Sequence, residues 1–398
     1  MMDKLRIVVE RYRVHLLSFG VVALVVGAFF FGGYYRYSCY YPFCSYRWQN
    51  PGHDVLVYGN NVTLRGRQIF ADGSRYGDLA SFGGRVYYAS QWGQVYDLSG
   101  EETKVLSAEK LLSDDDVELG GGVRGLVVDE GKEGKLLFYM WLLHRERQGD
   151  CWRVEVVRKH VASARWQRIY AMPECIGQAR MEESHQRFEM AGGRMQAYGE
   201  RLLMSIGSFA LSVEEEGTHR GKIIVMNKDG SEARIFARGV RNPQGLLVMG
   251  DGTIYESEHG AQGGDEINRI VEGGHYGFPY RSYGVPYRGQ AWANNRKYAA
   301  ADYMEPLFAF GVSPGVSDMT HVRLADIDGW EDVVLVSSLV GQSLFRLIIK
   351  EGRVVLVEPL LVGYRLRSVE FVDGHIYVKV DQYYSEAAIY RFDVRYKH

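Results

Sequence analysis

Proline, cysteine and excess charge are all scarce in this 398-residue sequence. It contains 9 prolines and 4 cysteines, and 47 basic residues against 49 acidic residues leave a formal net charge of −2. Such a balance lacks the electrostatic footprint of a nucleic-acid-binding protein, so we expect no nucleic-acid partner. Amphipathic helical patterns long enough to alternate with strands are also missing, which argues against an α/β fold.

The few cysteines do not have metal-binding spacing. Cys39 and Cys44 lie close together, Cys151 and Cys175 form a second group, and no Cys-x-x-Cys pattern occurs. An even number of cysteines is typical of disulfides in an oxidising compartment. A metal site is the weaker alternative, because no histidine is close to either group. The pairing cannot be deduced from the sequence.

Long hydrophobic runs are limited to the N-terminus. Residues 16–33 read LLSFGVVALVVGAFFFGG without a charge and follow a basic flank that includes Lys4, Arg6, Arg11 and Arg13. About 20 apolar residues span a bilayer core of ~30 Å, and basic flanks stay cytoplasmic. We therefore predict a single-pass membrane protein whose remainder is periplasmic or extracellular. The predicted segments are a cytoplasmic basic tail (1–15), a transmembrane anchor (16–35) and a tyrosine-rich juxtamembrane segment (36–50). A cleaved signal peptide is the alternative, although no small-x-small cleavage site follows the run.

The rest of the chain is rich in the residues of turns and strands. There are 47 glycines and 28 tyrosines, which favours an all-β protein. A phrase of strand, turn and strand recurs six times at intervals of roughly 40 to 75 residues, a period suited to propeller blades. The phrases begin at Gly83, Gly125, Gly193, Gly245, His321 and Ser368. We predict a six-bladed β-propeller over residues 51–398, with one short helix near residues 108–112 and an irregular loop at 286–301.

The stretch between residues 241 and 279 is the most informative part of the sequence. It contains RNPQG, EHG, GGDE and YGFP in this order, within short strands and glycine-rich loops. These motifs resemble those of the soluble glucose/sorbosone (aldose sugar) dehydrogenase family, and a weaker resemblance extends over about residues 75–395. The resemblance implies a six-bladed β-propeller that uses pyrroloquinoline quinone (PQQ) and calcium to oxidise sugars at C1.

Arginines are the expected cofactor-binding residues. The resemblance places Arg241 and Asn242 of RNPQG, and Arg365 and Arg367 of YRLRSV, at positions that bind PQQ. A tricarboxylate cofactor requires a cluster of guanidinium groups, and strand alternation puts Arg365 and Arg367 on one face. The alternative is that they are ordinary exposed arginines on a solvated strand.

The catalytic base that the resemblance implies is missing. The family's His-x-Gly-Gly-Arg phrase reads Met190-Ala191-Gly192-Gly193-Arg194 here, and a thioether cannot take a proton at any useful pH. The catalytic residue is therefore unknown, with Glu189 and His185 as weak candidates. The family's lysine also falls on Val340, which removes a positive charge.

A calcium site is the third expectation from the resemblance. Its backbone carbonyl ligands fall on Gly260 and Ala261, and such ligands suit a hard cation whatever the side chain is. Asp265 and Glu266 would hold a second ion or brace the loop. The structural alternative for both acids is that they accept backbone N–H groups and fix the turn.

These expectations lead to two main hypotheses of function. The first is a membrane-anchored, PQQ-dependent aldose sugar dehydrogenase. The second is a non-catalytic propeller of the same family that lost its base and binds a sugar, another small polar ligand or a protein partner. A calcium-dependent hydrolase or lactonase is a weaker third reading, for which Glu189, Glu258 and Asp265 are the available carboxylates.

Overall fold

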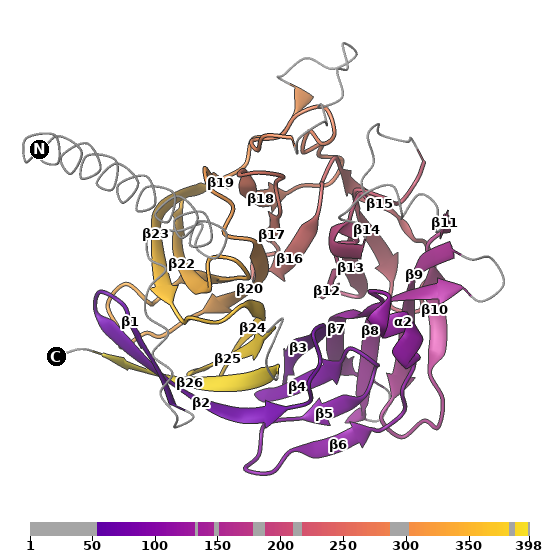
Figure 1. Ribbon diagram of the computed structural model, residues 1–398, viewed down its shortest axis with the longest axis horizontal. Coiled ribbons are helices and arrows are strands. Elements are labelled where there is room, and N and C mark those ends of the chain that lie inside the picture. The colour runs from indigo at the N-terminus through magenta and orange to yellow at the C-terminus, as the bar shows by residue number, and fades with distance from the viewer. Residues whose placement is uncertain are drawn as a thin grey trace, which may run out of the picture. The chain divides into compact units, whose positions relative to one another are not determined.

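The computed structural model describes residues 54–131, 134–146, 151–177, 188–209, 217–286, 302–381 and 387–396, all within one compact unit, Asn50–His398. The strands in these ranges form six antiparallel sheets around a common axis (Figure 1). The predicted six-bladed β-propeller is therefore confirmed. The predicted segments at 1–15, 16–35 and 36–50, the two cysteines at 39 and 44, His185 and most of the loop at 286–301 lie outside the described residues.

The first three blades follow one another along the chain. Blade 1 contains β3 (Gly77–Phe82), β4 (Arg85–Ser90), β5 (Val95–Asp97) and β6 (Lys104–Ser107). Blade 2 contains β7 (Gly122–Glu130), β8 (Leu136–Glu146), β9 (Cys151–His160) and β10 (Gln167–Ala171), and the short β11 (Ile176–Gly177) also pairs with β9. Blade 3 contains β12 (Arg194–Tyr198), β13 (Arg201–Ile206), β14 (Lys222–Asn227) and β15 (Arg234–Arg238).

Blades 4 to 6 complete the ring. Blade 4 contains β16 (Pro243–Val248), β17 (Ile254–Glu258), β18 (Asp265–Ile270) and β19 (Phe308–Phe310). Blade 5 contains β20 (Val316–Val322), β21 (Val333–Ser338), β22 (Ser343–Lys350) and β23 (Arg353–Leu361). Blade 6 contains β24 (Leu366–Val372), β25 (His375–Val380) and β26 (Ala388–Tyr396), and it is extended by β2 (Val62–Ala71) and β1 (Asp54–Tyr58).

Both ends of the described chain therefore meet in blade 6. Strand β2 pairs antiparallel with β26, from Val62 opposite Tyr396 to Ala71 opposite Ala388. In Figure 1 the indigo strands β1 and β2 accordingly lie beside the yellow β26. This pairing closes the ring, and it satisfies the edge of β26 that would otherwise be open to another strand.

The apolar core is divided among the interfaces between blades. Each of six hydrophobic clusters joins two neighbouring blades, so that the set runs around the whole ring. The largest, between blades 2 and 3, contains the fully buried Trp141 and Trp152 together with Met204. Because both faces of a blade are covered, a strand such as β8 (LLFYMWLLHRE) is apolar almost continuously instead of alternating. The interfaces thus explain why these sequences form buried strands.

Tight turns join the strands of each blade. Between β24 and β25, Asp373 and Gly374 have φ of 48° and 79°, the positive values that a two-residue hairpin turn requires. Between β22 and β23, Glu351 and Gly352 have φ of 50° and 71°, so a turn of the same kind joins these strands. Short turns of this kind let consecutive strands fill one blade before the chain moves to the next.

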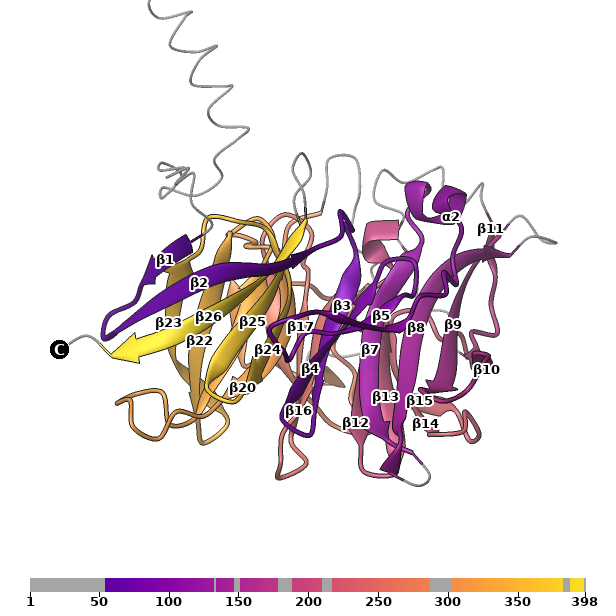
Figure 2. The same cartoon turned by 90° about the horizontal axis from the view of Figure 1, so that it is seen from below.

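The helix expected near residues 108–112 is displaced. The structure instead has α2 (Asp114–Glu118), at one end of the propeller in Figure 2. Ser113 and Asp116 form a reciprocal capping box, and the acidic first turn suits the helix N-terminus. Within the described residues, the structure has no helix with the length and apolar character that crossing a bilayer requires. The anchor at 16–35 stays a prediction.

Candidate functional site

The innermost strand of every blade begins beside one cavity. These strands are β3, β7, β12, β16, β20 and β24, which are neighbours around the ring. The axial cavity has a volume of about 270 Å³. It brings together most of the predicted site residues that the structure describes: Glu189, Met190, Arg241, Asn242, Gly260, Ala261, Asp265, Arg365 and Arg367. Glu258 and Glu266, which the structure also describes, do not line it. The three predicted arginines thus share one central cavity and are not ordinary exposed residues.

Arg365 immediately precedes β24, and Arg367 is the extra residue where the register with β25 shifts between Leu366 and Ser368, so strand alternation does not by itself place the two side chains. Both approach the fully buried Asp381, with Nη2–Oδ2 distances of 4.0 Å for Arg365 and 2.5 Å for Arg367. Burial tends to raise the pKa of Asp381, but the two guanidinium groups outweigh it and hold the pKa below its usual range. The Nε of Arg367 is buried and has no hydrogen-bond acceptor among the described residues. The Asp381 carboxylate therefore positions both arginines, and the Nε–H group of Arg367 remains available as a donor.

Arg241 and Asn242 precede β16 and are held by the neighbouring strand. Glu258, at the end of β17, accepts the backbone N–H groups of Arg241 and Asn242 at 2.5 and 3.2 Å. The Arg241 guanidinium donates through Nη1 to the carbonyls of His259 and Gly260, at 3.0 and 2.5 Å. The motif RNPQG thus needs the glutamate of EHG to keep its shape.

His259 lines the axial cavity, but neither of its ring nitrogens is free to accept a proton. The Oδ1 of Asn242 accepts from the Gly192 N–H at 3.2 Å and from Gln244 Nε2 at 2.8 Å, so the amide nitrogen of Asn242 faces His259. This nitrogen donates to Nδ1 of His259 at 3.2 Å, which leaves the ring hydrogen on Nε2. Burial lowers the pKa of His259 below 6.5. The neutral ring therefore has its acceptor nitrogen occupied, which does not suit a general base.

Met190 occupies the position where the resemblance implies the base. It ends a short 3₁₀ turn, η2 (Phe188–Met190), and its side chain is buried. Its sulfur lies 3.8 Å from Nη2 of Arg241. The preceding Glu189 is 54% exposed and approaches Nη2 of Arg75 at 3.6 Å. The site therefore places a thioether, which cannot accept a proton from an alcohol, against a guanidinium group.

Comparison with known proteins gives the context for this geometry. Residues 84–391 match the family model described as Glucose / Sorbosone dehydrogenase. The chain belongs to this family. It is 29% identical over 161 residues to an aldose sugar dehydrogenase, YliI, of Escherichia coli (strain K12), which is 39% of this chain and 43% of the relative. The chain spans about half or less of the length of the curated relatives that it matches.

Solved structures share the fold of this chain. The soluble aldose sugar dehydrogenase of Escherichia coli, in the apo form, has a TM-score of 0.70 at 18% identity, over 83% of this chain and all of that one (100%). The PQQ-bound form of aldose sugar dehydrogenase from Streptomyces coelicolor has a TM-score of 0.64 at 16% identity, over 85% and 99%. Identities this low show a common fold alone.

The loop that the family resemblance assigns to calcium is internally bonded. Asp265 accepts from the Gly260 N–H at 3.0 Å and from Ser313 Oγ at 2.5 Å through Oδ1. Its Oδ2 accepts from the N–H groups of Gly315 and Val316 at 2.7 and 3.0 Å. These four contacts are those of a bracing carboxylate, the structural alternative. The carbonyl of Gly260 accepts from Arg241, so a cation at this oxygen would compete with the guanidinium.

Two further arginines line the axial cavity and were not predicted. Arg75 precedes β3, and Arg124 belongs to β7. Their guanidinium carbons lie 5.2 and 4.4 Å from the ring centroid of Tyr76, and that of Arg367 lies at 5.2 Å. Arg124 follows two glycines in GGVRG, a charged residue inside an apolar strand. That pattern is the signal that could have identified it.

A buried acidic group lies behind the axial cavity in blade 4. Glu258 is opposite Glu266, and Glu256 is opposite Asn268, on β17 and β18. Burial raises the pKa of Glu258 to about 7 and that of Glu266 to about 9, and it raises the pKa of Glu256 well above 4.5. Asn268 Nδ2 donates to Glu256 at 3.0 Å and to Glu258 at 3.3 Å. Burial therefore favours the protonated form of these three carboxyl groups, which lie beneath the RNPQG motif.

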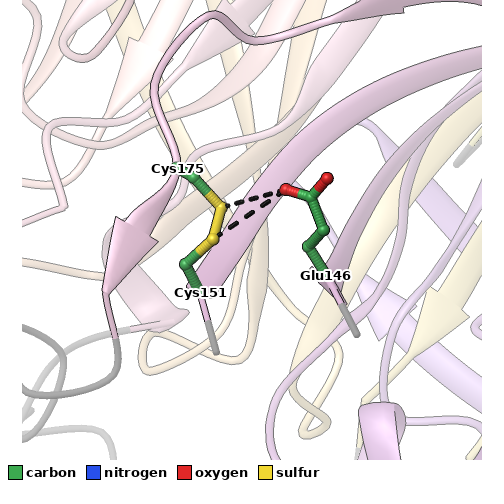
Figure 3. A group of neighbouring side chains, drawn as sticks. All are labelled: Glu146, Cys151 and Cys175. Atoms are coloured by element: carbon green, nitrogen blue, oxygen red, sulfur yellow. Dashed lines mark hydrogen bonds between the residues drawn. A yellow bond between two sulfur atoms is a disulfide. The ribbon is translucent and has the colours of Figure 1, made fainter. Parts of the chain in front are cut away.

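The second pair of cysteines forms a disulfide. Cys151 and Cys175 are joined, with their Cα atoms 5.5 Å apart, and this pairing settles one of the questions that the sequence left open. Figure 3 shows Glu146 beside the two sulfurs. Glu146 forms an ion pair of 2.8 Å with Arg153, and a disulfide offers neither a thiolate nor an S–H donor. This group is therefore a disulfide beside an ion pair, not a metal site.

Proposed function

We propose that the propeller binds PQQ, or a compact polycarboxylate of similar charge, in the axial cavity and holds it without oxidising an alcohol. One observation carries the proposal. The arginines of the RNPQG and YRLRSV motifs converge on the cavity, whereas Met190 replaces the base. Binding energy alone does not supply the proton transfer that alcohol oxidation needs.

The residues present fit the carboxylates of such a ligand. The buried Nε atoms of Arg124 and Arg367 lack acceptors among the described residues, and unmet buried donors favour an anion. Arg241, Arg365 and Arg367 would hold the carboxylates, and a calcium ion at the carbonyls of Gly260 and Ala261 would have to displace the Arg241 guanidinium from Gly260. When bound, PQQ supplies a quinone that accepts hydride. Because Asp381 already balances part of the charge, the arginines can be held close together before the ligand arrives.

The second candidate is PQQ-dependent oxidation of aldoses at C1, the activity in the family's name. It is favoured by the family match and by Glu189, a carboxylate that lines the cavity and is more than half exposed. Glu189 would then accept the proton of the sugar hydroxyl. This role would require it to leave Arg75, at 3.6 Å.

We also propose that the propeller acts outside the cytoplasm, tethered by residues 16–35. The Cys151–Cys175 disulfide supports an oxidising compartment. The ligand would be a sugar or another small polar molecule, and the membrane would be contacted through the N-terminal segment. A protein partner belongs to the non-catalytic hypothesis, and the near-neutral charge supports the expectation of no nucleic acid.

A titration of the full-length chain in detergent tests the proposed function. PQQ is added with and without calcium while its absorbance is followed, and then glucose and a redox dye are added. We expect saturable PQQ binding that Arg367→Met weakens, with no dye reduction by the wild type. Dye reduction by the wild type would establish the enzyme instead, and no PQQ binding would refute the cofactor.

A gain-of-function variant separates the two candidates further. Met190→His combined with Val340→Lys restores the two lost groups, and a positioned base contributes about 10²- to 10⁴-fold to a rate. We expect dye reduction to rise by this order in the double variant. Met304→His is the matched control, because Met304 is exposed and does not line the cavity.

A further inference from the structure

Arg124 is aimed into the axial cavity by its local backbone. It lies in β7 where the register with β8 shifts between Val123 and Gly125, so Arg124 is the extra residue of a bulge. Bulges re-aim a side chain out of the normal alternation. Gly193 of the neighbouring blade makes room for it, because a Cβ there would lie 2.6 Å from the Cβ of Arg124. The arginine thus occupies a site built by two blades.

The charge of Arg124 has no counterpart among the described residues. Its side chain is 5% exposed, and its one hydrogen bond is from Nη2 to the carbonyl of Gly120, at 3.1 Å. Its Nε has no acceptor, and no carboxylate of the described residues lies within ion-pair distance. Arginines this deeply buried are almost always paired, because an isolated buried charge is costly. The unmet charge therefore requires an explanation.

Two neighbouring arginines add to the excess of positive charge around Arg124. Arg75 and Arg367 lie over the same Tyr76 ring. Burial, and then repulsion from Arg367 and Arg75, outweigh the opposite effects of Tyr76 and Glu189 and lower the pKa of Arg124 to about 10. The group is still protonated at neutral pH. A ring face compensates a cation only in part, so the neighbourhood favours an incoming anion.

We propose that Arg124 binds an oxyanion of the ligand, a carboxylate or a phosphate, so that the axial cavity selects acidic sugars over neutral aldoses. The inference rests on the proposed function, because it assumes that the cavity holds a ligand. Arginine suits this role since its planar group offers paired donors to a carboxylate or phosphate. A neutral sugar would leave the same charge buried and unmet, which is the physical basis of discrimination.

Calorimetric titration of the full-length chain at low salt tests this selectivity. The probes are glucose, glucuronate, glucose 6-phosphate and inorganic phosphate. We expect either acidic sugar to bind about ten- to hundredfold more tightly than glucose, since hydrogen bonds to charged groups have free energies in this range. Glucuronate and glucose 6-phosphate distinguish a carboxylate site from a phosphate site. Inorganic phosphate shows whether the oxyanion alone binds.

Variants show whether Arg124 causes the preference. Arg124→Met should reduce the affinity for the acidic sugar to that for glucose while keeping the melting temperature at or above that of the wild type, because it removes an unpaired charge. Arg124→Lys keeps the charge but not the paired donors and should be intermediate. Arg201→Met is the matched control, since Arg201 is exposed at the start of β13.

The outcomes separate this inference from the proposed function. Equal affinity of the wild type for glucose and both acidic sugars would overturn the inference, and so would a preference that survives Arg124→Met in a folded variant. PQQ binding measured in the same preparation reports on the proposed function alone. Selective binding of acidic sugars without PQQ binding would support the proposed role of Arg124 and refute PQQ as the cofactor. PQQ binding without a preference for acidic sugars would support the cofactor and refute the role of Arg124.

Discussion

At the scale of single residues, hydrogen-bond partners separate structural arginines from those that line the axial cavity. Arg194 is buried and donates to Asp318 at 2.8 Å and to the carbonyls of Arg124 and Arg367 at 2.7 Å each. It therefore joins blades 2, 3, 5 and 6 and fixes the backbone beneath two arginines of the axial cavity. All three guanidinium nitrogens of Arg194 donate, whereas Nε of Arg124 and Nε of Arg367 find no acceptor within the part of the chain that the structure describes.

Asp381→Asn tests the charge that positions Arg367. Removing one partner of a buried ion pair leaves the other uncompensated, so we expect a loss of about 3 kcal/mol in the free energy of unfolding at pH 7. The folded-state pKa of Asp381 is depressed, so its contribution is complete above the unfolded pKa and is lost as pH falls through the folded pKa.

Urea denaturation between pH 7 and pH 3 measures this effect. The difference between wild type and Asp381→Asn should shrink toward the acid end of the range, as the wild-type carboxylate becomes protonated. Asp326→Asn is the control, because Asp326 is exposed in the loop between β20 and β21. A constant difference at all pH values would contradict the assigned cause.

At the scale of secondary-structure elements, the β17–β18 hairpin combines like charges on one face. Glu258 and Glu266 are directly opposite, a pairing that destabilises a sheet if both carboxyls are ionised. Arg241 and Arg281 also act on these groups from outside the hairpin, and Asp265 acts from the start of β18. The raised pKa values show that burial and mutual repulsion outweigh the arginines.

This hairpin predicts a pH dependence of stability. A carboxyl with a raised folded-state pKa binds more protons folded than unfolded, so its contribution is greatest below the unfolded pKa and falls as pH rises through the folded pKa. For Glu258 and Glu266 this loss of stability begins near pH 4.5, the ordinary pKa of a glutamate, and extends to their folded-state pKa values of about 7 and about 9. The cost of ionisation therefore accumulates above pH 5.

Glu256→Gln tests this pH dependence at the third carboxyl of the group, whose pKa is raised by burial and by Glu258. Glutamine cannot ionise, so in urea titrations the stability of the variant relative to the wild type should increase as pH rises above about 4.5, because the folded-state pKa of Glu256 is raised well above that value. Glu101→Gln, at an exposed turn, should leave the profile unchanged. A pH-independent difference between Glu256→Gln and the wild type would show that this carboxyl does not titrate with folding.

At the scale of the whole molecule, stability depends on closing the ring. The interface between blades 5 and 6 includes Leu64 of β2, which is completely buried. Leu64 is thus contributed by the start of the propeller sequence to a blade that otherwise comes from its end. Such a contact between distant parts of the sequence ties the six blades into one cooperative unit.

Leu64→Ala tests the importance of closure. A leucine-to-alanine substitution in a packed core typically costs about 2–5 kcal/mol, so we expect a loss of this size in the free energy of unfolding. Leu361→Ala makes the same chemical change at a side chain that is 49% exposed, and we expect about 0.5 kcal/mol or less. Chemical denaturation of both variants measures the difference. Similar losses in the two would mean that the closing strands contribute little.

The fold was largely predictable because its signals are local. Six strand–turn–strand phrases, with turns such as Asp373-Gly374, follow from the neighbours of each residue, and each phrase falls within the inner strand pair of a blade. The helix was misplaced by a few residues, because the capping box of Ser113 was overlooked. The arginines at 241, 365 and 367 came from motifs. Arg75 did not, because no local pattern shows that it faces the axis, and Arg124 is marked only as a charged residue inside an apolar strand.

What the sequence determined by itself was the class of fold, the turns, the family and the methionine at 190, where the family resemblance implies a histidine, since each is written in consecutive residues. The tertiary structure decided which residues share the axial cavity, how β2 and β26 close the ring, and that Cys151 pairs with Cys175. It also decided that the buried Nε of Arg124 has no acceptor among the described residues. These outcomes depend on contacts across the ring, between residues that the sequence separates by tens to hundreds of positions.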